Sequence, residues 1–209
     1  VPSRLQPLLP LLAQLTALAL KNGELMAERN QALARLSQHA GALSQIAPLA
    51  RELAGLLEPE AVLETLARAL AERFGFYRVT VALVRGEVLE GHLTVKEGRV
   101  YWTEGRSRLR LSLTSSPDPL ARAAREKASL LLPKEALPPG VAKDVGLNAA
   151  FVPVLAEDRV LGVLALDHGP AGGPVREEDL RYVELLAQAA GVAYRNAELF
   201  REKKALSLA

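Results

Sequence analysis

The chain has 209 residues, with 26 basic and 24 acidic side chains and no cysteine. This length holds one domain of ordinary size plus an extension. The near balance of charge disfavours nucleic acid as a direct partner, because nucleic-acid binders concentrate basic residues in a patch. The lack of cysteine excludes disulfides, thiolate catalysis and cysteine-ligated metal, and agrees with the cytoplasmic location that we expect. Arginine outnumbers lysine, which is typical of a thermophilic or GC-rich source.

Residues 1–57 show no strand signal and predict helix. Their apolar residues recur at alternating steps of three and four, the heptad period of helices that wind around one another. The seam that we expect to join two copies contains Leu15, Leu18, Asn22, Leu25, Leu36, Leu43 and Ile46. Asn22 has the character of a buried polar residue that sets the register of such a seam. Gly23, Gly41 and Pro48 predict breaks between helical pieces.

Two other roles for this segment stay open. Its apolar face could pack on the chain's own domain instead of on a second copy. A membrane role is disfavoured, because the uncharged stretch Leu5–Leu20 is shorter than the roughly 20 residues that a span needs and contains Pro7 and Pro10. No signal-peptide pattern follows Val1. We therefore expect a parallel homodimer with no membrane span in this segment.

Residues 59–146 combine helix and strand signals. An amphipathic helix is expected from Pro59 to Phe74, with acidic residues at its start and Gly75 at its end. The further expected elements are a hairpin around Arg85–Glu87, a second around Glu97 and Gly98, a strand at 109–113, a helix at 118–127, a strand at 129–132 and a loop at 133–146 with room for one helical turn.

Residues 147–200 contain the clearest succession of elements. A strand around Phe151–Val154 and a buried strand at 159–167 flank a tight polar turn, which predicts an antiparallel hairpin. Pro153 predicts an edge or a bulge, and Gly162 indicates that another backbone packs close. A Gly/Pro loop then leads to a long helix that opens on acidic residues, where the helix dipole favours negative charge.

This stretch resembles the C-terminal half of a GAF domain. The matching positions are Pro153, Gly162, Asp167, Glu178, Asp179, Leu180, Ala189, Ala193, Asn196 and Ala197. Arg176 departs from the pattern, because the family has a small capping residue there. The resemblance extends back to about Pro59 and implies an α+β fold, GAF-like and PAS-like, with a central six-stranded antiparallel sheet and helices. It also implies a bacterial signalling protein with flanking signalling helices, divided into a helical dimerisation segment at 1–57 and a sensor domain at 58–209.

The residues that could take part in catalysis or metal binding do not show the sequence spacing of a known kind of site. His39, His92 and His168 lack the spacing of a metal pair, and the loop at 169–174 lacks the Gly-Lys-Ser/Thr ending of a phosphate loop. GAF members that attach bilin or reduce free methionine sulfoxide use cysteines, and the Asn-Lys-Phe-Asp-Glu motif of cyclic-nucleotide binders is absent. Haem-binding members need a histidine, for which His92 is the candidate on a strand. We expect no enzyme activity, no metal and no cofactor.

The resemblance implies a small-molecule cavity between the sheet and the segments at 114–146 that cross it. The residues best able to line that cavity are His92, Tyr101, Trp102 and Phe151, since aromatic rings offer apolar contact with a polar tip. Burial as ordinary core residues is the competing interpretation for Trp102 and Phe151, and the one we favour. Arg106, Arg108 and Arg110 could meet an anionic ligand, although a solvated face that protects an edge strand is the simpler interpretation.

The last helix, 177–206, shows a second periodic pattern. Its positions are Leu180, Val183, Ala187, Ala190, Tyr194, Ala197 and Arg201, with small residues that allow a partner helix to come close. We expect this helix to be the output arm of a longer protein, with a kinase or cyclase domain downstream as the resemblance implies. Three functions follow: a dimeric regulatory sensor that binds a small ligand, a ligand-free dimerisation and relay module, and the effector-binding domain of a transcription regulator.

Overall fold

The computed structural model describes residues 20–21, 24–26, 28–30, 41, 44–103 and 109–207. The chain divides into two compact units, Val1–Ser44 and Gln45–Ala209. In the first unit the described residues are helical and exposed, including the seam residue Leu25. The other seam residues of this unit lie outside the described residues, namely Leu15, Leu18, Asn22, Leu36 and Leu43. The predicted heptad seam therefore stays a prediction.

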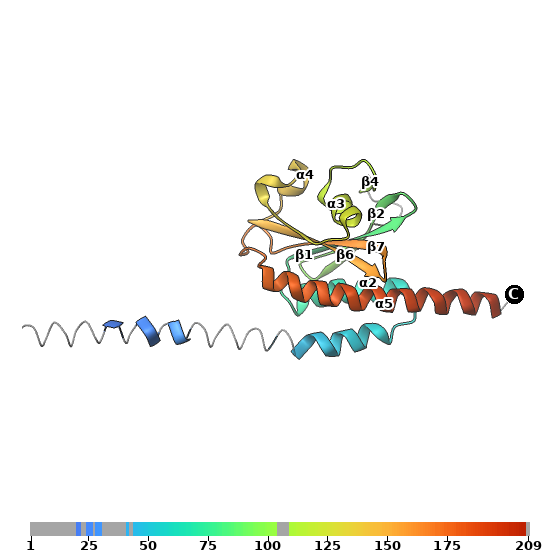
Figure 1. Cartoon of the computed structure of the whole chain (residues 1–209), viewed down its shortest axis with the longest axis horizontal. Helices are drawn as coiled ribbons and strands as arrows, with labels where there is room; N and C mark the ends of the chain where they lie inside the picture. The colour runs from blue at the N-terminus through green and yellow to red at the C-terminus, as the bar shows by residue number, and fades with distance from the viewer. Residues whose placement is uncertain are drawn as a thin grey trace, which may run out of the picture. The chain divides into compact units, whose positions relative to one another are not determined.

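The second unit is built on one sheet of seven strands in its described part, and every strand pair is antiparallel (Figure 1). The strands are β1 (Arg78–Arg85), β2 (Val88–Lys96), β3 (Arg99–Trp102), β4 (Arg110–Ser112), β5 (Leu130–Pro133), β6 (Asn148–Ala156) and β7 (Arg159–Asp167). Their order is β3-β2-β1-β7-β6-β5, and β4 also pairs with β2. The sheet confirms the expected α+β fold, with one strand more than the six expected.

A bulge interrupts the pairing of β2 with β1. Val81 of β1 pairs with Leu93, whereas the next residue, Ala82, pairs with Gly91, so His92 is the extra residue. A bulge bends and twists the strand that carries it. Strand β3 pairs with β2 on one side of this bulge and β4 on the other, so β2 has two short partners along the same edge.

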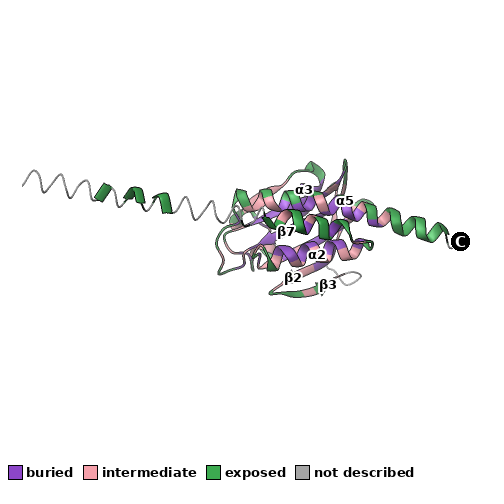
Figure 2. Cartoon of the chain, turned by 90° about the horizontal axis from the view of Figure 1, so that it is seen from below, coloured by how far each residue is buried: buried purple, intermediate pink, exposed green. Residues whose placement is uncertain are grey.

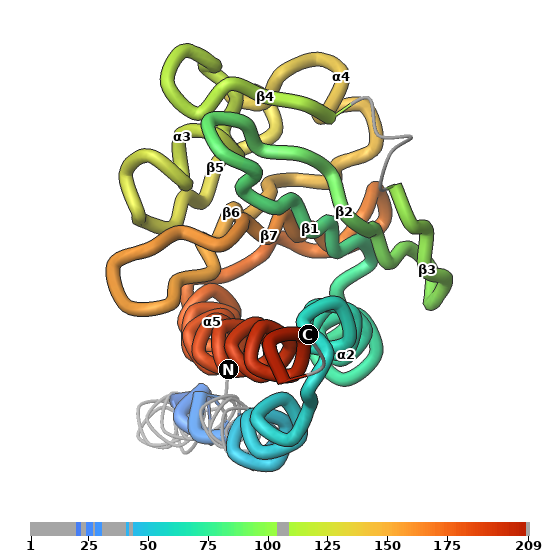
Figure 3. Tube along the Cα trace, turned by 90° about the vertical axis from the view of Figure 1, so that its right-hand side faces the viewer, coloured from blue at the N-terminus to red at the C-terminus, as the bar shows by residue number. Residues whose placement is uncertain are grey.

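Helices cover both faces of the sheet (Figures 1 and 3). One face carries α2 (Pro59–Glu72) and α5 (Glu177–Ser207). The opposite face carries α3 (Pro119–Glu126), a short 3-10 turn (Lys134–Ala136) and α4 (Pro139–Ala142). No helix in the described ranges is both long enough and apolar enough to span a membrane.

Local sequence signals explain where these helices begin and end. Asp118 caps α3, because its carboxylate accepts a hydrogen bond from the N–H of Leu120 at 2.9 Å. Gly75, with φ +76°, adopts the left-handed conformation just beyond the end of α2. Helix α5 begins at Glu177, as predicted. The Arg176 N–H donates to the carboxylate of Asp179 at 3.0 Å, so this helix start is capped although Arg176 is not a small residue.

The core lies mainly between the sheet and helices α2 and α5, whose inward faces are buried (Figure 2). The helical residues 45–54 belong to the same unit, and Leu49 and Leu53 in them are fully buried in this core. Ile46 is partly buried against it. These turns thus pack on their own domain, which was the alternative role for the N-terminal segment.

The periodic pattern expected along α5 also faces this core. Val183, Ala187, Ala190, Tyr194 and Ala197 are buried there. Gly191 lets α5 come close to β6, since a Cβ at this position would collide with the carbonyl oxygen of Leu155. The small residues therefore accommodate the chain's own sheet and α2, and the expectation that they receive a partner helix was wrong.

Candidate functional site

The four residues expected to line a ligand cavity do not come together at one place in the structure. His92 is 2% exposed, and its ring meets that of Trp102 edge to face at 5.3 Å between centroids. Trp102 pairs across the sheet with Leu93, which belongs to the core under α2 and α5. Phe151 is buried in the other cluster, beneath α3.

Tyr101 pairs with Thr94, and the Thr94 hydroxyl lies 3.1 Å from that of Thr80. Residues that pair directly across an antiparallel sheet share a face. Tyr101 therefore lies on the opposite face from Trp102, and about half of its surface is exposed. The structure thus brings together His92 and Trp102, and it does not bring either to Phe151. A ligand role for these residues stays a prediction.

The expected basic face is described only in part. Arg106 and Arg108 lie outside the described residues, as does His39. Arg110, on β4, forms an ion pair with Glu90 of β2 at 3.3 Å, and the Arg110 side chain is 71% exposed and that of Glu90 41%. This contact agrees with the interpretation of Arg110 as part of a solvated strand face.

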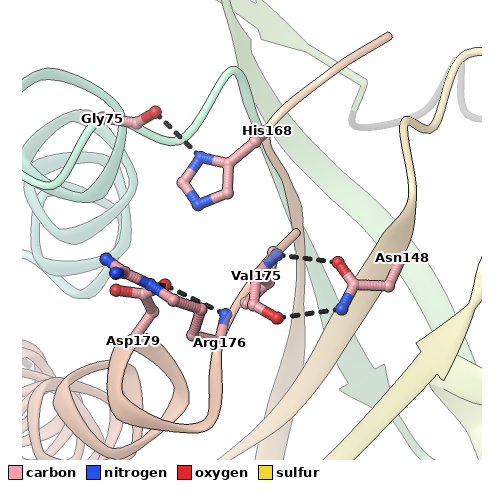
Figure 4. A network of polar contacts seen from close by, with 6 residues as sticks. All are labelled: Gly75, Asn148, His168, Val175, Arg176 and Asp179. Atoms are coloured by element: carbon pink, nitrogen blue, oxygen red, sulfur yellow. Dashed lines mark hydrogen bonds and ion pairs between the residues drawn. The ribbon is translucent and has the colours of Figure 1, made fainter. Parts of the chain in front are cut away.

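A network that the sequence did not predict joins the sheet to the start of α5 (Figure 4). We call it the junction, and it contains Gly75, Asn148, His168, Val175, Arg176 and Asp179. Asn148 is the first residue of β6. Its side-chain oxygen accepts from the Val175 N–H at 2.7 Å, and its amide nitrogen donates to the Val175 carbonyl at 2.8 Å. The side chain thus bonds the backbone of Val175 as a neighbouring strand would.

His168 provides a second link in the junction. It follows β7, and its Nδ1 lies 3.2 Å from the carbonyl oxygen of Gly75 at the end of α2. Its ring stacks on Phe76, with 4.8 Å between centroids and 5° between planes. The end of β7 is therefore attached to the end of α2, which explains His168 as a structural residue.

The loop that follows β7 is anchored through Asp167, which is buried. One carboxylate oxygen of Asp167 pairs with Arg78 at 2.8 Å, and the other accepts from the N–H of Gly169 at 2.8 Å. Gly169 has φ +72°, a conformation that favours glycine. The loop thus leaves the sheet in a single defined direction.

Two loops touch through their backbones at the junction. A Cβ at Gly146, just before β6, would collide with the carbonyl oxygen of Gly169, just after β7. In the same loop, a Cβ at Gly172 would collide with the carbonyl oxygen of His168. The backbones of the α4–β6 loop and of the loop that leads into α5 are therefore in direct contact at this point.

The junction borders a shallow pocket of about 440 Å³. Its lining is Phe74, Gly75, His168, Gly172, Gly173, Pro174, Arg176 and Asp179. The Arg176 guanidinium lies 3.3 Å from the Asp179 carboxylate, so the two charges compensate each other. Across the described part of the chain, no three His, Asp or Glu side chains gather as a metal site would require.

A separate ion pair ties α2 to α5. Glu60 meets Arg201 at 3.1 Å. Partial burial acts to raise the pKa of Glu60, but the hydrogen bond to its own backbone N–H and the Arg201 guanidinium outweigh that effect, so the pKa is lowered. Near this pair, burial raises the pKa of the Tyr194 hydroxyl. Glu60 thus stays ionised, and its pair with Arg201 joins the two helices.

Sequence reasoning missed Gly146 and Asn148, which contact the segment between β7 and α5. A glycine and an asparagine just before a strand are usual turn residues, and that is how such a pattern is normally interpreted. Their partners, Gly169 and Val175, lie more than 20 residues further along the chain. No local signal marks such a pairing.

Solved structures share this fold. The GAF-B domain of DevS from Mycobacterium smegmatis is 22% identical, with a TM-score of 0.57 over 70% of this chain and 99% of that one. The GAF domain of a phosphoenolpyruvate-protein phosphotransferase from Coxiella burnetii is 14% identical, with a TM-score of 0.63 over 80% and 98%. The free methionine-R-sulfoxide reductase of Neisseria meningitidis is 18% identical, with a TM-score of 0.61 over 78% and 93%.

No curated protein sequence matches the chain significantly. The profile of the GAF domain, however, matches residues 58–194, which is more than half of the chain and includes the whole sheet. The arrangement of the sheet, with α2 and α5 on one face and α3 and α4 on the other, agrees with this match. The chain therefore belongs to the GAF domain family.

Proposed function

We propose that this chain is a non-catalytic regulatory module of a signalling protein, which relays a change on the α3/α4 face of its sheet to α5. The observation that carries the proposal is the backbone contact between Gly146 and Gly169. It links the loop that leaves α4 to the loop that begins α5, and Asn148 bonds the same two segments together.

The names of the solved neighbours support a regulatory role. They include a methyl-accepting chemotaxis protein and the GAF domain of a phosphotransferase. Other neighbours are free methionine-R-sulfoxide reductases. This chain contains no cysteine, so it has no thiol for a thiol-based reduction. We therefore place it with the regulatory members, as a cytoplasmic homodimer attached to an output domain.

The input is a ligand or a partner that acts on the α3/α4 face. Phe151 fills the space beneath α3, packed in one cluster with Leu120 and Ala124. A small molecule that bound there would have to displace this packing, and the displacement would reach α4 and the loop at Gly146. This supports a module in which the position of α4 is the signal and α5 is its recipient.

A pair of glycine variants tests the relay. Gly146→Ala places a methyl group against the backbone of Gly169, whereas Gly173→Ala, in the loop before α5, places one in open space. We expect hydrogen exchange in the first three turns of α5 to increase at least about tenfold in Gly146→Ala and to stay unchanged in Gly173→Ala. Faster exchange confined to the two loops, with α5 as protected as in the wild type, would contradict the relay.

A further inference from the structure

Strand β3 carries two aromatic side chains that the fold leaves half exposed. Tyr101 and Trp102 are 49% and 48% exposed, and Trp102 is the single tryptophan of the chain. They lie on opposite faces of the strand, with Trp102 on the same face as the core residue Leu93. Tyrosine and tryptophan side chains are typical of the few residues that dominate the binding energy of protein interfaces.

The outer edge of β3 is open. Among the described strands, β3 is the last of the sheet and pairs with β2 alone (Figure 3). The N–H of Thr103 donates to the carbonyl oxygen of His92 in β2 at 2.9 Å, so the backbone groups of Thr103 and of alternate residues before it face β2. The N–H and C=O groups of Val100 and Trp102 therefore point away from β2, toward the place of a further strand.

A tight turn holds this edge in position. Glu97 and Gly98 connect β2 to β3 with φ angles of +52° and +72°, the two positive values of a type I′ turn. The N–H of Glu97 donates to the carbonyl oxygen of Tyr77 at 3.3 Å, and the Glu97 carboxylate accepts from the Tyr77 hydroxyl at 2.6 Å. The edge is thus preorganised, which lowers the entropy cost of binding a partner.

One face of this edge is basic. Arg78 of β1, Lys96 of β2 and Arg99 of β3 lie directly opposite one another. Asp167 compensates Arg78 at 2.8 Å, and the Lys96 ammonium lies 5.5 Å from the centre of the Tyr77 ring. Arg99 is exposed and forms no ion pair with any described residue. Like charges on paired residues are unfavourable, so an acidic side chain beside Arg99 would offset this repulsion.

These charges determine which kind of partner fits. Positive side chains on a short strand protect an edge from pairing with a second copy, because each copy would bring its own Lys96 and Arg99. The same side chains attract an acidic segment. The other face of the edge, with Val100 and Trp102, offers apolar contact to such a segment.

We propose that the outer edge of β3 binds an extended acidic segment of a partner protein, which adds to the sheet as a further strand. The apolar side chains of the segment lie opposite Val100 and Trp102, and its acidic side chains lie opposite Arg99 and Tyr101. This contact adds a partner to the proposed function and does not depend on the relay at Gly146.

Two capped hexapeptides test the proposal on the full chain, one of alternating valine and glutamate and the other of alternating valine and lysine. The fluorescence of Trp102 reports binding, because a strand added at this edge removes water from its indole ring. We expect the glutamate peptide to bind at least about tenfold more tightly than the lysine peptide. Equal affinities, or unchanged fluorescence with both peptides, would overturn the proposal.

A matched pair of variants locates the site. Arg99→Glu and Arg159→Glu each reverse the charge of an exposed arginine that begins a strand directly after a two-residue turn. We expect Arg99→Glu to weaken binding of the glutamate peptide at least about tenfold and Arg159→Glu to leave it unchanged. Equal weakening in both variants would show attraction to net charge alone and would refute the edge site.

Val100→Pro tests the backbone contact, because proline lacks the N–H that points away from β2. We expect this variant to bind the glutamate peptide at least about tenfold more weakly, whereas Val100→Thr, which keeps the N–H, should bind as the wild type does. A glutamate peptide methylated at its backbone nitrogens makes the same test without altering the protein. Binding that survives both changes would contradict strand addition.

A second copy at this edge would give a different result. The full chain would then form assemblies larger than a dimer, which Val100→Pro would disperse, and neither peptide would change the fluorescence of Trp102. That outcome would replace the acidic partner by a second copy and so overturn the proposal.

Discussion

At the scale of single residues, the structure distinguishes polar side chains that hold the fold from those that could act on a ligand. Asp167 pairs with Arg78 and orients the loop at Gly169. Asn148 bonds both backbone groups of Val175. A half-buried amide or a buried carboxylate with such partners stabilises one conformation, and losing one partner leaves the other unsatisfied. These side chains are structural, and their positions make them determinants of where α5 begins.

The ion pair between Glu60 and Arg201 predicts that the stability of the fold depends on pH. The pKa of Glu60 is lowered in the fold from its ordinary value of 4.5, so its pairing with Arg201 contributes fully above about pH 4.5 and is lost as the pH falls through the lowered value. We expect Glu60→Gln to reduce the free energy of unfolding at pH 7 by at most about 1 kcal/mol, since the pair is more than one third exposed. The difference from the wild type should become smaller as the pH falls from 7 to 3.

Urea unfolding at the two pH values measures this effect. Glu64→Gln is the matched control, because Glu64 pairs with Arg68 within α2 and does not reach α5. A Glu60→Gln difference that is as large at pH 3 as at pH 7 would show that the loss arises from packing and not from charge.

At the scale of elements, α5 carries two apolar patterns on different sides. One contains small residues and faces the sheet, and the other contains Leu185, Val192 and Leu199 and is exposed. Both have the helical period, so periodicity establishes the helix and both of its apolar sides. Only the position of β6 determines which of the two becomes the core side. Gly191 lies on the core side, because it is the residue at which the helix contacts the backbone of Leu155.

Gly191→Ala tests the close approach of α5 to β6. Alanine is favoured over glycine inside a helix by about 1 kcal/mol, so helix propensity alone predicts stabilisation. The collision of the new methyl group with the Leu155 carbonyl should outweigh this gain. We expect a net loss of about 1–3 kcal/mol in the free energy of unfolding, measured in urea. Gly173→Ala, in open space, serves as the control, and a stabilised Gly191→Ala protein would refute the contact.

At the scale of the whole molecule, the described residues place the start of the compact unit at Gln45. Leu49 and Leu53 are part of its core, although the sequence assigned them to a separate helical segment that ends at residue 57. Burial of leucine side chains contributes on the order of 2 kcal/mol each. A chain cut at residue 58 should therefore lose stability as well as any dimer contacts, whereas a cut at residue 45 should spare the core.

Light scattering after size exclusion tests the oligomeric state. We expect the full chain to be a dimer, and a chain of residues 45–209 to dissociate more readily because the predicted seam is removed. The 45–209 chain should have nearly the same melting temperature as the full chain, while the 58–209 chain should melt at a lower temperature. This comparison distinguishes the loss of dimer contacts from the loss of core packing. A full chain that stays monomeric at high micromolar concentration would contradict the heptad seam.

The sequence alone determined what depends on near neighbours in the chain. The turn at Glu97 and Gly98, the helix that begins next to Asp118 and the acidic start of α5 were all predicted, because backbone preference and helix electrostatics act over a few residues. The resemblance to the GAF domain was confirmed over residues 58–194. The tertiary structure decided the strand order, the separation of Phe151 from Trp102, and the contact between Gly146 and Gly169. These depend on which surfaces meet after the chain has folded, and no periodicity or turn signal encodes them.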